Sequence, residues 1–123
     1  MVTDRAQLQA LTGVWRGAGH VAGSAATVAL IAPKIDDAFR NHTLQFDLGQ
    51  LAMTLILTAT DLGIGTGHSA VSEQDLARRI LKFPEDRFCA WLIALGYPAD
   101  GPIRPLKKHN RRPFEEVVDK GAW

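Results

Sequence analysis

The chain has 123 residues, 46% of them apolar and 22% charged, which is the composition of an ordinary globular domain. Its net charge of +1 gives no general attraction to nucleic acids or membranes, so neither is an expected partner. A single cysteine excludes an internal disulfide, the longest uncharged apolar stretch (48–60) is too short to span a bilayer, and no apolar signal segment opens the chain. A cytoplasmic location is therefore expected.

The first third of the chain predicts a helix followed by a strand. Thr3 or Asp4 can cap a helix that runs to about Arg16, because apolar residues recur there at helical spacing. The glycines at 17 and 19 should then end this helix. Residues 27–32 form a short continuous apolar run, which is typical of a buried strand.

A long helix is predicted over residues 43–62, after a polar segment at 33–41 that is either a loop or the approach to a helix. Its apolar residues occur almost all the way round, which is typical of a helix buried on most sides. Two sources of cover remain open, namely a second subunit and structure that would precede this segment in a longer fold.

Three alternating glycines, Gly63, Gly65 and Gly67, follow this helix in what the sequence predicts to be a loop. They do not make a dinucleotide fingerprint, since the third glycine would have to stand at His68 and the motif would have to follow a strand. No Gly-Lys-Ser/Thr follows either, which excludes a nucleotide-hydrolase phosphate loop. A helix C-cap explains Gly63, and a backbone that approaches a ligand closely would explain the set.

The second half predicts a helix, a central strand and an extended tail. Ser72 is expected to cap a helix over 73–82, with Asp75 in the capping-box position, and residues 88–97 should form the strand. The tail over 98–113 is rich in proline, and Pro113 can begin one helical turn.

Several chemistries find no support in the sequence. His68 and Ser69 are adjacent but lack a nucleophile-elbow motif, the four histidines lack metal-ligand spacing, and Cys89 lies within an apolar strand, where an inert thiol is expected. The basic residues between 104 and 112 suit a phosphate group. A solvated tail and, less favoured, a nucleic-acid surface are the alternatives for this cluster.

Taken together, three segments strongly resemble the C-terminal part of the nitroreductase family. They are LGIGTGH (62–68), CAWLIALGYPAD (89–100) and NRRPFEEVV (110–118). The resemblance implies an α+β fold, with a mixed or antiparallel sheet flanked by helices. The chain would be one partial domain over 1–123, lacking the N-terminal part of the fold and its flavin motifs, with an extended C-terminal arm over about 98–123.

The resemblance also implies a function. Family members bind FMN at a homodimer interface and transfer hydride from NAD(P)H to nitroaromatics, quinones or similar small acceptors, and the long helix would form the dimer core. The implied cofactor-binding residues are Gly67, His68, Ser69, Ala70 and Val71 beside the flavin ring, and Lys108, His109 and Arg111 at the phosphate. No catalytic side chain and no metal ligand is implied. The alternative is a non-catalytic protein or interaction subunit with an incomplete flavin site.

Overall fold

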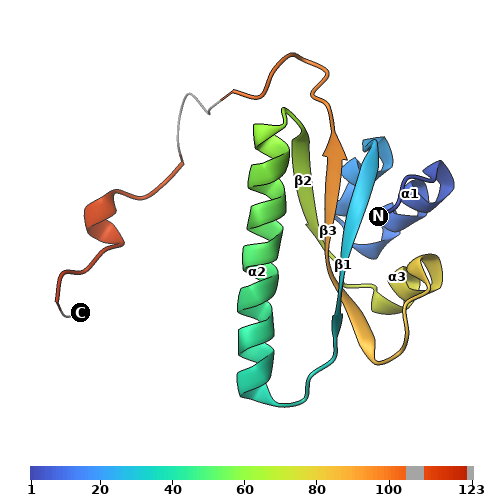
Figure 1. Ribbon diagram of the computed structural model, residues 1–123, viewed down its shortest axis with the longest axis horizontal. Coiled ribbons are helices and arrows are strands. Elements are labelled where there is room, and N and C mark those ends of the chain that lie inside the picture. Colours follow the sequence, from blue (N-terminus) through green and yellow to red (C-terminus); the bar gives the residue numbers. More distant parts are fainter. Residues whose placement is uncertain (105–109, 122–123) are drawn as a thin grey trace.

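The computed structural model describes residues 1–104 and 110–121 (Figure 1). Its elements, in chain order, are α1 (Arg5–Leu11), the 3-10 turns η1 (Thr12–Val14) and η2 (Ala18–Gly23), β1 (Ala26–Pro33), α2 (Ala38–Asp61), β2 (Gly65–Ala70), α3 (Gln74–Leu81), β3 (Arg87–Gly96) and the 3-10 turn η3 (Phe114–Glu116). The strands form an antiparallel sheet in the order β1-β3-β2. The predicted α+β class is confirmed, and the sheet of the described residues is antiparallel.

The sheet lies between two layers of helices (Figure 1). The long helix α2 covers one face, where its apolar residues meet Leu30, Ala32 and Ile93. On the other face α1, η1, η2 and α3 surround a second cluster, whose fully buried side chains include Leu8, Leu11 and Leu92. Because both faces are covered, the strands are apolar on both sides, and this explains their continuous apolar runs.

The two strands predicted from apolar runs are confirmed with small shifts in their bounds. The predicted 27–32 corresponds to β1, and the predicted 88–97 corresponds to β3, which is the central strand of the described sheet. Val2 and Thr27 of β1 exchange two backbone hydrogen bonds of 2.8 Å, which form an isolated antiparallel bridge to this strand.

A β-bulge interrupts the pairing of β1 with β3. Leu30 pairs with Trp91 and Ile31 with Cys89, so Ala90 is the extra residue on β3. Both Ala90 and Trp91 therefore pack on the α2 side of the sheet. The bulge lies where β2 ends its own pairing, at Ala70 and Trp91.

The long helix α2 begins at Ala38, earlier than the predicted residue 43. The reason is an N-cap at Asp37, whose carboxylate accepts a hydrogen bond of 2.8 Å from the Arg40 N–H. The described residues cover one face of the helix, and Phe39, Phe46 and Leu57 on the other side are largely exposed. The cover that the sequence predicts on most sides thus does not come from the described part of this chain.

Two helix boundaries differ from the sequence prediction. The first helix ends at Leu11 instead of Arg16, because Thr12 and Gly13 are poor helix formers and Trp15 is extended. Of the glycines predicted to end it, Gly17 precedes η2 as its N-cap and Gly19 lies within η2. Ser72 does not cap α3. Its hydroxyl donates instead to the Val14 carbonyl, at 3.1 Å, and the helix begins without a side-chain cap.

The glycine segment after α2 is a strand and not the predicted loop. Gly63 alone has a positive φ (73°) and ends the helix, and residues 65–70 pair with β3 as β2. After β3 the chain leaves the sheet, and its last turn, η3, lies apart from it on the α2 side (Figure 1). This turn begins after Pro113, as predicted. Within the described residues, none of the helices could cross a bilayer.

Candidate functional site

The five residues expected beside a flavin ring are distributed over both faces of β2 and the turn that follows it. Gly67 and Ser69 face the layer of α1 and η2. Ser69 is buried there, and its hydroxyl donates to the Ala70 carbonyl at 3.0 Å. Gly67 lies under the His20 ring, because a Cβ at this position would stand 2.8 Å from Cδ2 of that ring. Only backbone groups of these two residues remain for an external ligand.

His68 lies on the opposite face, toward α2, because side chains alternate along a strand. Its ring is exposed and meets Trp91 of β3 edge to face, with 5.7 Å between the ring centroids and 69° between the ring planes. Such T-shaped pairs are favourable geometries for aromatic rings. His68 and Trp91 thus form an aromatic wall that faces the long helix.

A groove of about 270 Å³ separates this wall from α2. Its lining residues are Gln45, Gly49, Ala52, Met53 and Ile56 from α2, His68 from β2 and Trp91 from β3. No atom would contact a Cβ at Gly49 within 4 Å, so a missing side chain helps to open the groove. The groove is mainly apolar, and its polar side-chain groups are the Gln45 amide, the His68 imidazole and the Trp91 indole N–H.

The turn after β2 is held by one carbonyl group. The Val14 oxygen accepts hydrogen bonds from the Ser72 N–H at 3.0 Å, the Glu73 N–H at 3.1 Å and the Ser72 hydroxyl at 3.1 Å. Val71, the last of the expected ring contacts, packs against the core beneath this turn. The segment is therefore fixed before any ligand arrives.

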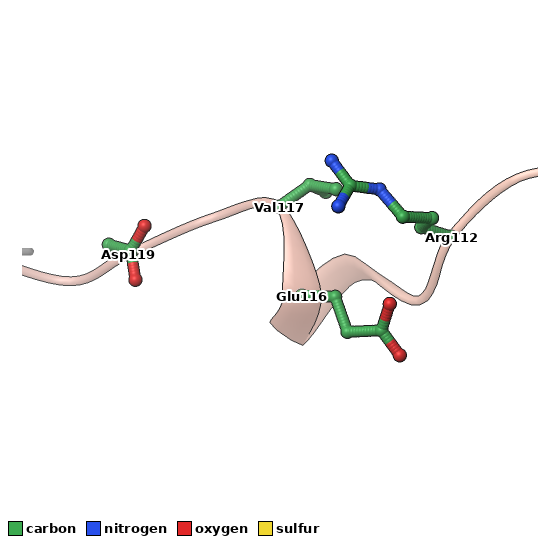
Figure 2. Close-up of a pocket in the computed structure, with 4 residues that line it drawn as sticks. All are labelled: Arg112, Glu116, Val117 and Asp119. Atoms are coloured by element: carbon green, nitrogen blue, oxygen red, sulfur yellow. The ribbon is translucent and has the colours of Figure 1, made fainter.

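The groups expected at a phosphate lie on the C-terminal arm. Arg111 is exposed, and Lys108 and His109 fall outside the described residues. Figure 2 shows the neighbouring Arg112 extending along the chain toward Val117, with the carboxylates of Glu116 and Asp119 around the same open hollow. Among the described residues, neither Arg111 nor Arg112 takes part in an ion pair.

The described part of the arm does not meet the groove of its own chain (Figure 1). The arm departs from the end of β3 and carries η3 away from the sheet (Figure 1). Phe114, Val117 and Val118 on this arm remain exposed, although apolar side chains gain free energy by burial. A complete site that used both parts would need the arm of a second chain.

Cys89 is confirmed as an inert buried thiol. Its side chain is fully buried, and burial raises its pKa from the ordinary 9.0 to about 11. Since only the thiolate is an effective nucleophile, this shift disfavours a nucleophilic role for Cys89 near neutral pH.

This pKa predicts how stability depends on pH. The folded chain keeps the thiol proton up to about pH 11, whereas the unfolded chain releases it near pH 9. Above pH 9, the Cys89 contribution should therefore lower the unfolding free energy by up to about 1.4 kcal/mol per pH unit until about pH 11. Denaturant titrations of the wild type and Cys89→Ala at pH 8 to 11 would measure this difference, and equal slopes for both proteins would contradict it.

Sequence patterns alone did not single out the α2 side of the groove. The one signal was Gly49, an isolated glycine in the interior of a helix, where it costs about 0.5–1 kcal/mol relative to alanine. Trp91 was predicted to lie in a strand, but the bulge at Ala90 determines on which face of the sheet its side chain lies.

Comparison with known proteins gives the fold a name. No protein-family model matches the sequence, and no curated protein sequence matches it. Solved structures do match, however. A candidate NADH dehydrogenase/NAD(P)H nitroreductase from Parabacteroides distasonis superposes with a TM-score of 0.80 and 19% identity, over 99% of this chain and 70% of that one.

Two further solved structures point the same way. An FMN-dependent nitroreductase from Clostridium difficile has a TM-score of 0.79 at 18% identity, over 99% of this chain and 73% of that one. An NADPH:FMN oxidoreductase from Vibrio harveyi, complexed with NAD+, has a TM-score of 0.73 at 19% identity, over 99% of this chain and 57% of that one. The chain therefore has the nitroreductase fold, which confirms the resemblance indicated by its sequence motifs at the level of the fold.

Proposed function

We propose that the chain binds FMN as a homodimer and acts as an NAD(P)H-dependent oxidoreductase on nitroaromatics, quinones or similar small acceptors. The observation that carries this proposal is the match of 99% of the chain to an FMN-dependent nitroreductase structure. The groove between α2 and the His68–Trp91 wall adds a place for the flavin ring on this fold.

The groove suits the ring part of FMN and not the whole cofactor. Its volume of about 270 Å³ lies just below the 300–1,000 Å³ typical of sites that enclose a drug-sized ligand. Its walls are apolar, with His68 and Gln45 able to orient polar atoms of a heteroaromatic ring. Because β2 is an edge strand of the described sheet, alternate backbone N–H and C=O groups along its free side are also available.

The phosphate end requires cations, and Arg111 is the described residue proposed for this role, with Lys108 and His109 beside it. A guanidinium can bind phosphate through two parallel hydrogen bonds. The arm extends away from the groove of its own chain. We therefore assign Arg111 of one copy to the phosphate of the flavin whose ring lies in the groove of the other copy.

A second copy would also cover the outer side of α2. Phe39, Phe46 and Met53 follow one another at intervals of seven residues, and Leu57 lies four residues further on, so these side chains form one apolar stripe along the helix. Helices that pair through such seven-residue repeats bury the stripe between them. The proposed dimer therefore joins the two grooves and the two arms at one interface.

Bound flavin supplies the hydride chemistry, and the protein supplies position and electrostatics. In this proposal the His68–Trp91 wall and the backbone of Ala70 and Val71 hold the ring, and Arg111 of the second copy holds the phosphate. None of the residues around the groove is required as a general acid or base.

A direct test is titration of the purified full chain with FMN, followed by flavin absorbance and fluorescence. Saturable binding, and oxidation of NADPH or NADH with a quinone acceptor by the loaded protein, are the expected results. Protein that gains no flavin signal at any FMN concentration would overturn the proposal.

The substitution Gly49→Leu should block the groove. The fold should persist, because a Cβ at this position would meet no atom within 4 Å and leucine favours the helix more than glycine does. The affinity for FMN should fall at least about tenfold, which corresponds to about 1.4 kcal/mol. Gly19→Leu is the matched control, because a Cβ at Gly19 would also meet no atom within 4 Å, but this residue lies in η2, away from the groove. Equal FMN affinities for both variants would remove the groove from the site.

A second candidate function is a non-catalytic protein with the same fold, acting as an interaction subunit. One observation favours it, namely that the described part of a single chain does not bring the groove and the arm cations together. This candidate predicts a folded, self-associating chain that gains no flavin signal, so the same FMN titration decides between the two.

A further inference from the structure

The side chain of Gln74, the first residue of α3, pairs with the backbone of β3 as a strand residue would. Its amide Nε2 donates to the Cys89 carbonyl at 2.8 Å, and its Oε1 accepts from the Cys89 N–H at 2.9 Å. The second Nε2 proton goes to the Val71 carbonyl at 2.9 Å. Both donors of the amide are used, and all three bonds have good donor–acceptor distances.

These bonds occur where the ladder between β2 and β3 stops. The last backbone pair is Ala70 with Trp91, and the chain of β2 then turns toward the Val14 carbonyl. Beyond this point β2 no longer offers backbone partners to Cys89, and the Gln74 amide takes their place. The same amide fixes the Val71 carbonyl, so the turn is held from the Val14 side and from the β3 side.

We propose that Gln74 is a positioning residue, which fixes the end of β2, where Ala70 pairs with Trp91 of the groove wall, and so sets the shape of the site for a flavin held in the groove. This inference rests on the proposed function, because it assumes that FMN binds there. A carboxamide is the group suited to this role, since it offers one acceptor and two donors in one plane. A glutamate at this position has the same shape and can still accept from the Cys89 N–H, but its second oxygen would be repelled by the Val71 and Cys89 carbonyl oxygens. A leucine makes none of the three bonds.

The test compares Gln74→Leu and Gln74→Glu with Ala77→Gly in the full chain. Ala77 is a buried residue of the same helix, and its replacement by glycine weakens α3 without touching the amide. Three quantities are measured: the thermal midpoint, the FMN dissociation constant, and the midpoint potential of bound FMN at saturation. Hydrogen exchange of the Val71 to Glu73 amides is followed without flavin.

The variants are compared at matched loss of thermal stability. Both Gln74 variants should weaken FMN binding about tenfold or more and shift the flavin potential, because each loses at least two hydrogen bonds and one such bond is worth up to about a factor of ten. Ala77→Gly should leave the potential unchanged. For Gln74→Glu the affinity should recover in part as the pH is lowered, because the protonated carboxyl regains one donor. If Gln74→Leu does not fold, the isosteric Gln74→Glu carries the comparison.

The outcomes separate this inference from the proposed function. If the wild type binds FMN, but both Gln74 variants keep the wild-type potential and weaken FMN no more than Ala77→Gly does at matched stability, the amide is structural and the inference is overturned. Unchanged exchange of the Val71 to Glu73 amides in Gln74→Leu would overturn it as well. If the wild type binds no FMN, both the proposed function and the positioning role of Gln74 are overturned, whatever the exchange data show.

Discussion

The double substitution Phe46→Asp and Leu57→Asp is expected to convert the dimer to monomers and to abolish FMN binding. Both side chains are mostly exposed in the single chain, at 68% and 61%, so the monomer should still fold. In the proposed dimer they lie on the stripe that faces the second copy, where unpaired carboxylates from both chains would be buried. We expect the dimer dissociation constant to rise at least about a hundredfold, which corresponds to about 2.7 kcal/mol.

Sedimentation velocity over a range of protein concentrations measures this change, and circular dichroism verifies the fold. The control is Gln9→Asp, which adds a negative charge to exposed α1 in the layer remote from α2. A double variant that remains dimeric would show that α2 does not form the interface. A monomeric variant that still binds FMN with wild-type affinity would show that one chain suffices for the cofactor.

The substitution Arg111→Ala should weaken FMN about ten- to a hundredfold, because a hydrogen bond to a charged group is worth about 1.5–3 kcal/mol. Riboflavin has the same ring and ribityl chain but no phosphate, so its affinity should change little. The preference for FMN over riboflavin is therefore the quantity of interest, and raised salt should reduce it in the wild type.

Titration of both flavins into both proteins gives this preference. Arg79→Ala is the matched control, since Arg79 is an exposed arginine on α3. If Arg111→Ala and Arg79→Ala weaken FMN equally, or if Arg111→Ala weakens riboflavin as much as FMN, the arm does not hold the phosphate.

The sequence predicted the elements whose signal is local. The apolar runs of β1 and β3 are long enough to mark strands, and the long apolar stretch of α2 marks a helix, although burial on most of its sides is not seen in the described chain. The turn after Pro113 followed from the fixed φ of proline. The class of fold was expected from a different source, namely the resemblance of three sequence segments to a known family.

Other features depend on distant parts of the chain. Residues 65–70 form a strand only because β3 supplies the backbone partners, and three residues of low strand propensity, Gly65, Gly67 and Ser69, conceal it in the sequence. The Ser72 cap was wrong because the Val14 carbonyl competes for the hydroxyl. The Gln74 bonds to Cys89 also join separate segments of the chain, and no local pattern marks them.

The candidate site was predicted in part. His68 was expected beside a ring, and the structure places it in the wall of an open groove, but the opposite wall comes from α2 and was not predicted. Gly67 was expected to open the backbone to a ligand, and one of its sides is closed by His20, a residue of η2 that no sequence pattern singled out.

The central claim is that the groove of one copy and the arm of another hold the same FMN molecule. Co-expression of Gly49→Leu and Arg111→Ala chains with different tags tests it, since a mixed dimer would contain one site with both an intact groove and an intact arm. Random pairing should restore tight FMN binding at about one quarter of all sites, although each variant alone binds weakly. Isolated mixed dimers that bind FMN no better than either parent would contradict the account.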